Sequence, residues 1–290
     1  MPELPEVEVV KKSLTRKTQN LIIKEVKIHD CRLRYKVDKK EVKKIIGLKI
    51  EKILRRSKYL LFYFKKSSCV MLVHLGMTGK FFFVDKKNIK YKTSFYYDIE
   101  EDKDKKHDRI TIYFSNKQKL IYNDIRKFGF IKFFDKVDLY RNLHLSHLGP
   151  EPLSEKFNIK YFKKYTFGRY RSVKDILMDQ KFVSGLGNIY VNEILFYSKI
   201  NPKKKINTLV NREINNILKF TKKILFKAIR HGGSSIKDFS SSSGKKGSYQ
   251  QYFAVYGRKG EKCIKKNCAG IINKIFLANR ASFYCSKCQK

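Results

Sequence analysis

The sequence predicts a multidomain α+β protein with an N-terminal β-sandwich and flanking helices, a helical domain and a C-terminal zinc-binding hairpin. Three observations support this prediction. Apolar and aromatic runs recur about every ten residues in the first half, helical spacing follows a stretch rich in Gly and Pro, and four of the six cysteines lie near the C-terminus. The expected divisions are a β-sandwich at 1–134, a linker at 135–153, a helical domain at 154–253 and a zinc hairpin at 254–290.

The first domain is expected to open with a helix and continue as strands. Leu4, Val7, Val10 and Leu14 recur at helical spacing, which predicts an amphipathic helix over about 5–17. Short apolar runs separated by turn residues then predict the strands of a β-sandwich. The expected strands are 21–29, 48–54, 59–64, 69–75, 80–84, 94–99, 109–115, 119–122 and 128–134.

The second half has helical periodicity. Its beginning, 148–153, reads Leu-Gly-Pro-Glu-Pro-Leu and is expected to belong to the linker, because Gly and Pro interrupt regular structure. The expected helices are 172–181, 188–199 and 209–231. The Ser-, Gly- and Lys-rich segment 234–251 is expected to be a mobile loop.

The charge balance indicates a polyanionic partner. The formal net charge is +40, from 66 Lys and Arg against 26 Asp and Glu, and nucleic acid is the commonest such partner. The excess is mostly lysine, which an AT-rich coding sequence would also produce, so the arginines carry more weight. No apolar run approaches the roughly 20 residues of a membrane span, and no signal-peptide pattern is present. We expect a cytoplasmic monomer that binds no membrane.

Four cysteines form the most specific motif. Four residues separate Cys263 from Cys268, two separate Cys285 from Cys288, and sixteen lie between the pairs. Two such pairs are typical of a tetrathiolate zinc site, and four thiolates fill the tetrahedral shell, so the ion is expected to be structural. Arg280 lies on the hairpin between the pairs, where it could hold a phosphate. We expect one Zn²⁺ and no nucleotide cofactor.

The first residues combine a nucleophile with a carboxylate. If Met1 is removed, Pro2 presents a secondary amine, which can attack an aldehyde carbon and form a cationic iminium ion. Glu3 lies beside it and is suited to proton transfer. A purely structural explanation is also available, because Pro5 and Glu6 are favoured near a helix N-terminus. These residues alone leave both explanations open.

Several candidate residues lie in predicted turns. Lys58, between two strands, is either a solvated turn residue or a group that reaches a phosphate or a proton-transfer site. Met77, in a glycine-rich loop, is either a core side chain or an exposed wedge for a base stack. Arg126 and Phe128 are two residues apart, a spacing that places both on one face of a strand. Asn188 follows two glycines at a helix start, which form either a phosphate site or a tight turn.

Together these features resemble the bacterial formamidopyrimidine-DNA glycosylases over nearly the whole chain. The matching motifs occupy 1–8, 57–59, 74–79, 148–153, 179–180, 187–190, 255–258 and 280–285. Leu4 is typical of the branch that acts on oxidised purines, whereas the related endonuclease VIII branch usually begins Pro-Glu-Gly-Pro-Glu. The resemblance implies a helix-two-turn-helix domain around 185–188 and a zinc finger, although Cys-x4-Cys is wider than the family's usual first cysteine pair.

The resemblance also implies a bifunctional DNA glycosylase and abasic-site lyase, acting on double-stranded DNA with oxidised purines or abasic sites. Pro2 would attack the anomeric carbon of a flipped-out nucleotide and form a Schiff base, and Glu3 would transfer protons. Lys58 would assist β-elimination, and Arg280 would hold the phosphate through δ-elimination. The residues that the resemblance places at the DNA are Glu6, Met77, His107, Arg126, Phe128, Arg169, Lys174 and Asn188.

Two alternatives remain open at this point. The chain could be an endonuclease VIII-like enzyme for oxidised pyrimidines, a choice that the loop at 240–251 would decide. It could instead be a non-catalytic, zinc-dependent protein that binds damaged DNA. Such a protein would tolerate a blocked N-terminus, whereas the enzyme requires a free Pro2 amine.

Overall fold

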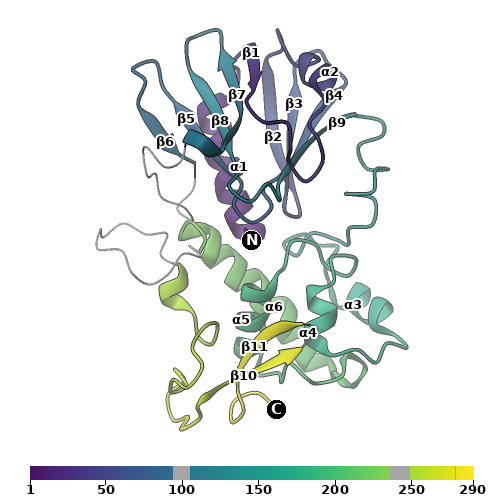
Figure 1. Cartoon of the computed structure of the whole chain (residues 1–290). Coiled ribbons are helices and arrows are strands. Elements are labelled where there is room, and N and C mark those ends of the chain that lie inside the picture. Colours follow the sequence, from purple (N-terminus) through teal and green to yellow (C-terminus); the bar gives the residue numbers. More distant parts are fainter. Residues whose placement is uncertain (94–104, 235–248, 278) are drawn as a thin grey trace. The chain divides into compact units, whose positions relative to one another are not determined.

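In the computed structural model, the chain divides into two compact units, shown in Figure 1. The residues that the structure describes are 1–93, 105–234, 249–277 and 279–290. Unit 1 comprises 1–146 and 231–248, and unit 2 comprises 147–230 and 249–290. Each unit has its own hydrophobic core, so the two are described separately.

Unit 1 is a β-sandwich that begins with helix α1 (Leu4–Thr18). In spatial order, one sheet consists of β1 (Ile23–Ile28), β7 (Asp108–Phe114), β8 (Lys119–Asn123), β5 (Lys80–Val84) and β6 (Lys90–Lys92). The other sheet consists of β2 (Ile50–Arg56), β3 (Tyr59–Phe64), β4 (Cys69–His74) and β9 (Phe130–Asp135). All neighbouring strands pair antiparallel, and the predicted β-sandwich is confirmed.

The two sheets and α1 share one core. Phe62 of β3 and Phe81 of β5 meet there, with ring centroids 6.2 Å apart. Val7 and Leu14 of α1 are buried in the same core, which accounts for the helical spacing of apolar residues. Nearly every residue of β3 and β5 is buried, so their sequences are apolar without alternation, apart from Lys80 at the start of β5.

Two parts of unit 1 differ from the sequence prediction. Helix α2 (Lys39–Lys43) was not expected; Asp38 caps it by accepting a hydrogen bond from the backbone of its first turn. Only Val42 of this helix is buried, so apolar periodicity could not indicate it. The strand expected at 94–99 lies outside the described residues, and β6, just before it, pairs with β5.

Unit 2 consists of helices and a β-hairpin (Figure 1). Its helices are α3 (Ile159–Thr166), α4 (Val173–Met178), α5 (Asn188–Ser198) and α6 (Asn211–Arg230). The hairpin pairs β10 (Ile272–Leu277) with β11 (Arg280–Cys285). Short 3₁₀ helices occur in unit 2 at Ile206–Thr208 and Tyr249–Tyr252, and in unit 1 at Lys105–His107. Helix α5 is the central element of unit 2, since it is almost entirely buried and packs against α4, α6 and β11.

A buried carboxylate joins α5 to the segment that leads into the hairpin. Glu193 accepts backbone N–H bonds from Ala254, Val255 and Tyr256 at 2.8, 3.0 and 2.9 Å. Burial raises the pKa of Glu193, and the three N–H donors act in the opposite direction. The hairpin is therefore held to the helical core on its N-terminal side.

Helix α3 and the segment 234–251 also differ from expectation. Helix α3 buries only Phe162 and Thr166, too few residues to reveal a helical period. Ser234 is buried, and Tyr249 begins a 3₁₀ helix and packs against other aromatic rings, so both ends of 234–251 are folded. Packing of Tyr249 orders the C-terminal end of this segment. The Ser- and Gly-rich composition of the segment gave no indication of this order. The rest of the expected mobile loop, 235–248, lies outside the described residues.

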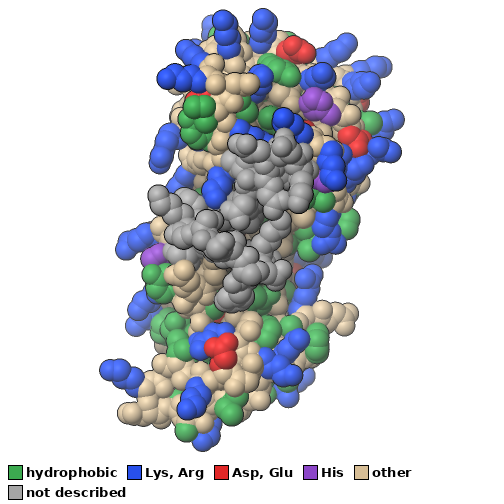
Figure 2. Space-filling view, turned by 60° about the vertical axis from the view of Figure 1, so that its left-hand side comes forward, with side chains coloured by type: hydrophobic (Ala, Val, Ile, Leu, Met, Phe, Trp, Pro, Cys, Tyr) green, Lys and Arg blue, Asp and Glu red, His purple; other side chains and the backbone are tan. Residues whose placement is uncertain are grey.

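The surface agrees with the composition. Lys and Arg side chains are spread over the face shown in Figure 2, and few acidic side chains lie among them. Among the residues that the structure describes, no helix is long and apolar enough to cross a membrane.

Candidate active site and nucleic-acid interface

The N-terminus of α1 is a buried capping box. Glu3 is the N-cap residue; its carboxylate accepts from the Glu6 backbone, and the Glu6 carboxylate accepts from the Glu3 N–H at 2.9 Å. Pro2 is buried, and Glu3 is only 4% exposed. The structural role weighed for Glu6 is therefore confirmed, and Glu3 shares it. It also holds the carboxylate of Glu3 next to the candidate nucleophile.

Glu6 has a second function in the same region. Its Oε1 accepts from the backbone N–H of Ser234 at 2.7 Å and from the Ser234 hydroxyl at 3.0 Å. Gly233 lies so close that an added Cβ would be 2.9 Å from Oε1, and its φ of +79° also favours glycine. This buried carboxylate therefore fixes the chain at the start of the segment 235–248.

Lys58 lies in the tight turn between β2 and β3. Ser57 has a φ of +56°, and its carbonyl accepts from Arg55 Nη1 at 2.8 Å. Arg55 Nε also donates to Glu8 of α1 at 2.8 Å. One guanidinium thus links the turn that carries Lys58 to the helix that begins beside Pro2. The structure buries Lys58, which is 7% exposed, although a lysine in a turn is ordinarily solvated.

His74 lies close to Lys58. It pairs with Tyr59, the residue after Lys58, in the register of β3 and β4. Burial lowers the pKa of His74 to about 4, and the positive charge of Lys58 adds to this effect. His74 Nδ1 accepts a hydrogen bond from the backbone N–H of Gly76 at 3.1 Å. The ring is therefore a neutral neighbour of Lys58 at physiological pH.

The loops that carry Met77, Arg126 and Phe128 lie side by side in unit 1. Met77 is 43% exposed and Phe128 is 45% exposed, so Met77 does not fill the core. The Arg126 guanidinium lies over the Phe128 ring, 4.5 Å from its centroid. Residues 124–129 form a turn, not a strand. Stacking, and not strand alternation, therefore keeps Arg126 and Phe128 together.

His107 ends a 3₁₀ helix and is supported by a buried arginine. Arg109 Nη2 lies 3.4 Å from His107 Nδ1, and Arg109 Nη1 donates to Asp30 at 3.2 Å. Asp30 also pairs with Arg32 and Lys127, and these hydrogen bonds hold its pKa well below the usual range. The five residues line one basic groove, in which the half-buried Asp30 carboxylate is surrounded by cationic side chains.

In unit 2, two polar side chains converge next to Arg280. Lys174 Nζ donates to the Ala281 carbonyl at 2.9 Å and to Ser282 Oγ at 2.6 Å, and Asn188 Nδ2 donates to the same carbonyl at 3.0 Å. Arg280 itself is exposed at the start of β11. Lys174 is fully buried, so it positions the strand that carries Arg280 from behind.

Burial affects the Lys174 ammonium directly. It lowers the pKa of Lys174 to about 8; the nearby charge of Arg280 adds to the decrease and Asp175 opposes it. Arg169, also in unit 2, is exposed; its guanidinium lies 4.4 Å from the Tyr165 ring centroid. The Arg169 side chain is therefore at the protein surface, whereas the Lys174 side chain is buried in the interior of unit 2.

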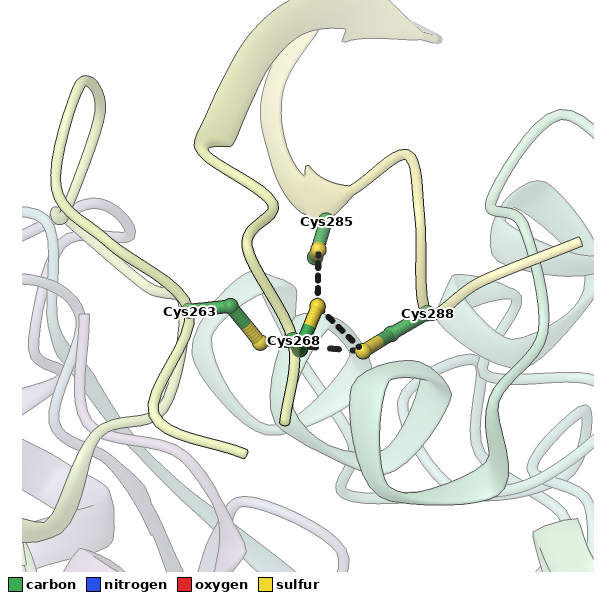
Figure 3. A group of neighbouring side chains, drawn as sticks. All are labelled: Cys263, Cys268, Cys285 and Cys288. Atoms are coloured by element: carbon green, nitrogen blue, oxygen red, sulfur yellow. Dashed lines mark hydrogen bonds between the residues drawn. The ribbon is translucent and has the colours of Figure 1, made fainter. Parts of the chain in front are cut away.

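The four C-terminal cysteines form a cluster that suits a zinc ion (Figure 3). Their Sγ atoms all lie within 4.8 Å of one another, with separations of 3.7 Å for Cys263–Cys288 and for Cys268–Cys285. Zn–S bonds of about 2.3 Å place tetrahedral sulfur atoms about 3.8 Å apart. The Sγ atoms of Cys268 and Cys288 lie closer, at 3.2 Å, and the wider Cys-x4-Cys pair brings both of its sulfur atoms into the cluster.

Comparisons with known proteins agree over the entire chain. Residues 1–131 match the formamidopyrimidine-DNA glycosylase N-terminal domain, and 148–240 match the H2TH domain of the same glycosylase. Relatives named formamidopyrimidine-DNA glycosylase are 39% identical in Idiomarina loihiensis and 37% identical in Rhodopseudomonas palustris; each alignment covers 100% of both chains.

Solved structures agree as well. The Lactococcus lactis protein in complex with Fapy-dG containing DNA is 33% identical, with a TM-score of 0.83 and 100% of both chains covered. MutM in complex with carbocyclic 8-oxo-G containing DNA is 34% identical, with a TM-score of 0.82 and 100% of both chains covered. Fold and site together define a DNA-repair glycosylase with an H2TH domain. The chain belongs to the formamidopyrimidine-DNA glycosylase family.

The candidate residues fall into two groups. Unit 1 holds Pro2, Glu3, Glu6, Lys58, Met77, His107, Arg126 and Phe128, and unit 2 holds Arg169, Lys174, Asn188, Arg280 and the four cysteines. Sequence reasoning missed the residues that support them, above all Arg55 and Arg109. Their isolated positions form no motif, and only their pairing in the fold reveals them.

Proposed function

We propose that this protein is a DNA glycosylase with abasic-site lyase activity that excises 8-oxoguanine and formamidopyrimidines from double-stranded DNA. The observation that carries the proposal is the buried start of α1, where a capping box of Glu3 and Glu6 directly follows the buried Pro2. Arg55 links this helix to the turn of Lys58. A nucleophile, a carboxylate and an amine are thereby fixed on one rigid scaffold.

Base release begins with the Pro2 amine, after Met1 has been removed. Its lone pair attacks C1′ of the flipped-out nucleotide, the N-glycosidic bond breaks, and the departing base takes the bonding electrons and a proton. Glu3 stabilises the developing positive charge on the sugar and transfers protons as the ring opens. The product is an iminium ion between Pro2 and C1′, which needs no further protonation to withdraw electrons.

Strand cleavage follows from the iminium ion. Loss of a C2′ proton breaks the C3′–O bond, which is the β-elimination, and Lys58 assists at the phosphate on that side. A second elimination breaks the C5′–O bond and leaves a one-nucleotide gap. Arg280 holds the phosphate through this step, and Lys174 and Asn188 support it by fixing Ala281.

The remaining residues bind and open the DNA. His107, Arg169 and Asn188 contact the sugar-phosphate backbone, to which Lys174 adds positive charge, and Glu6 lies within the lesion pocket. Met77, Arg126 and Phe128 fill the space that the flipped nucleotide leaves and meet the opposite base. One Zn²⁺ on Cys263, Cys268, Cys285 and Cys288 would stiffen the hairpin that carries Arg280.

Product analysis tests the proposal. A duplex with one 8-oxoguanine opposite cytosine is incubated with the protein, and the cleaved ends are separated by electrophoresis. Release of 8-oxoguanine together with a one-nucleotide gap is expected, and the Arg280→Ala variant is expected to accumulate the β-elimination product. Cleavage only of a duplex with an oxidised pyrimidine would favour the endonuclease VIII-like alternative. Tight binding with no cleavage of either would favour a non-catalytic reader of damage.

A further inference from the structure

The loops 74–79 and 124–129 are joined by one fully buried carboxylate. Asp124 Oδ1 accepts from the Thr78 hydroxyl at 2.5 Å, and Asp124 Oδ2 accepts from the Gly129 backbone N–H at 2.8 Å. Thr78 Oγ1 in turn accepts from the backbone N–H of Arg126 at 3.0 Å. Asp124 and Thr78 thus bond to each other and to the backbone of the 124–129 turn.

A buried phenol fills the space behind these bonds. Tyr122 is 1% exposed and hydrogen-bonds to the Asp124 carboxylate; burial, then that carboxylate, raises its pKa well above the usual value. A Cβ added to Gly129 would lie 1.9 Å from the Tyr122 hydroxyl, and a Cβ on Gly79 would lie 2.5 Å from it. The phenol is therefore tightly packed against one glycine of each loop.

The loop backbones also touch directly, and the turn is anchored from behind. A Cβ on Gly76, whose φ is +60°, would lie 2.4 Å from the backbone N of Gly129. Arg109 Nε donates to the Asp124 carbonyl at 2.9 Å, and the same guanidinium is paired with Asp30. Neither loop can move without breaking buried hydrogen bonds, which are costly to leave unmade.

We propose that Thr78, Asp124 and Tyr122 form a brace that fixes the side chains of Met77, Arg126 and Phe128 as one preformed wedge. The proposal rests on the proposed function, since it names the positioning residues of the stack-opening step. A wedge must displace stacked bases, and a loop that first had to order itself would lose part of its binding free energy. The brace removes that ordering cost. Asp124 and Tyr122 are buried, so they act on the DNA through the two loops.

This role makes a specific prediction about substrates. The brace matters while bases are still stacked, and matters little when the stack is already open. We therefore compare two DNA molecules that carry the same 8-oxoguanine: a fully paired duplex, and a duplex in which mismatches flank the lesion and form a small bubble. Single-turnover excision rates are measured on both at saturating enzyme.

The Thr78→Val variant keeps the side-chain size and removes the hydroxyl. We expect excision to slow about tenfold on the paired duplex, because the lost hydrogen bond contributes a free energy that corresponds to about a factor of ten in rate. On the bubble substrate we expect excision to slow less than about twofold. Tyr122→Phe should show the same substrate dependence. Thr166→Val is the matched control, because its hydroxyl also donates a buried bond, to the Phe162 carbonyl at 2.9 Å, within helix α3 of unit 2. Its two rates should fall by equal factors or not at all.

Three results would overturn the inference. Equal losses on both substrates for Thr78→Val and Tyr122→Phe would mean that these residues serve general stability. Unchanged rates on the paired duplex would mean that the wedge needs no brace. If the wild-type protein excises from neither substrate, the proposed function itself fails, and the brace fails with it.

Discussion

The buried ammonium of Lys174 predicts an unusual dependence of stability on pH. The lysine pKa falls from 10.5 to about 8 on folding. Between these values the unfolded chain binds a proton that the folded chain has released, so the free energy of unfolding rises as pH increases through about 8. With a pKa of 10.5 in the unfolded chain and about 8 in the folded chain, the free energy of unfolding increases by about 2 kcal/mol from about pH 7 to about pH 9.5.

The gain is isolated by comparison with Lys174→Met, which retains the aliphatic stem and cannot titrate. Urea unfolding is followed by circular dichroism at several pH values, and the difference in unfolding free energy between wild type and variant is plotted. The difference should shift by about 2 kcal/mol in favour of the wild type as pH rises. Lys160→Met, at an exposed position on α3, is the control and should give a constant difference. A constant difference for Lys174→Met would refute the reasoning.

Three further predictions concern activity and binding. Arg55→Met removes the link between α1 and the turn of Lys58 and should slow Schiff-base formation about tenfold. Lesion affinity, measured in a gel-shift assay, should be unchanged. A normal rate of Schiff-base formation would contradict the role of this link. Zinc removal by a chelator should abolish DNA binding, while circular dichroism retains the β-sheet signal of unit 1; full binding without zinc would oppose a structural role. Affinity for undamaged duplex should fall steeply with salt, measured by fluorescence anisotropy, and a flat response would argue against phosphate contacts.

Local sequence patterns predicted the parts of the fold whose signals are local. Strands β3 and β5 were expected with the bounds that the structure has, since their runs are apolar and aromatic apart from Lys80. The cysteine spacing predicted the cluster in Figure 3, because two pairs on one hairpin have few ways to meet. Helices α2 and α3 were missed, because few of their residues are buried.

The support of the site depends on contacts that no local pattern encodes. Thr78 and Asp124 are 46 residues apart, and the motif at 74–79, which contains Thr78, does not indicate that Asp124 is its partner. Lys174 and Lys58 are buried, although lysine is among the residues least often found inside a protein. Their positions follow from partners supplied by distant segments, such as Ala281 for Lys174. The sequence therefore indicated which residues have reactive groups, and the fold determines how they are held.

The central claim is that the Pro2 amine forms a covalent bond with the damaged nucleotide, and borohydride trapping tests it most directly. The protein is incubated with a duplex that carries one 8-oxoguanine, borohydride is added, and covalent adducts are separated on a denaturing gel. The account predicts a stable protein–DNA adduct. This adduct should disappear in a variant that retains Met1 before Pro2, and also in a variant that retains Met1 and carries Pro2→Gly. An adduct that persists in these variants would show that another amine is the nucleophile, and would contradict the account.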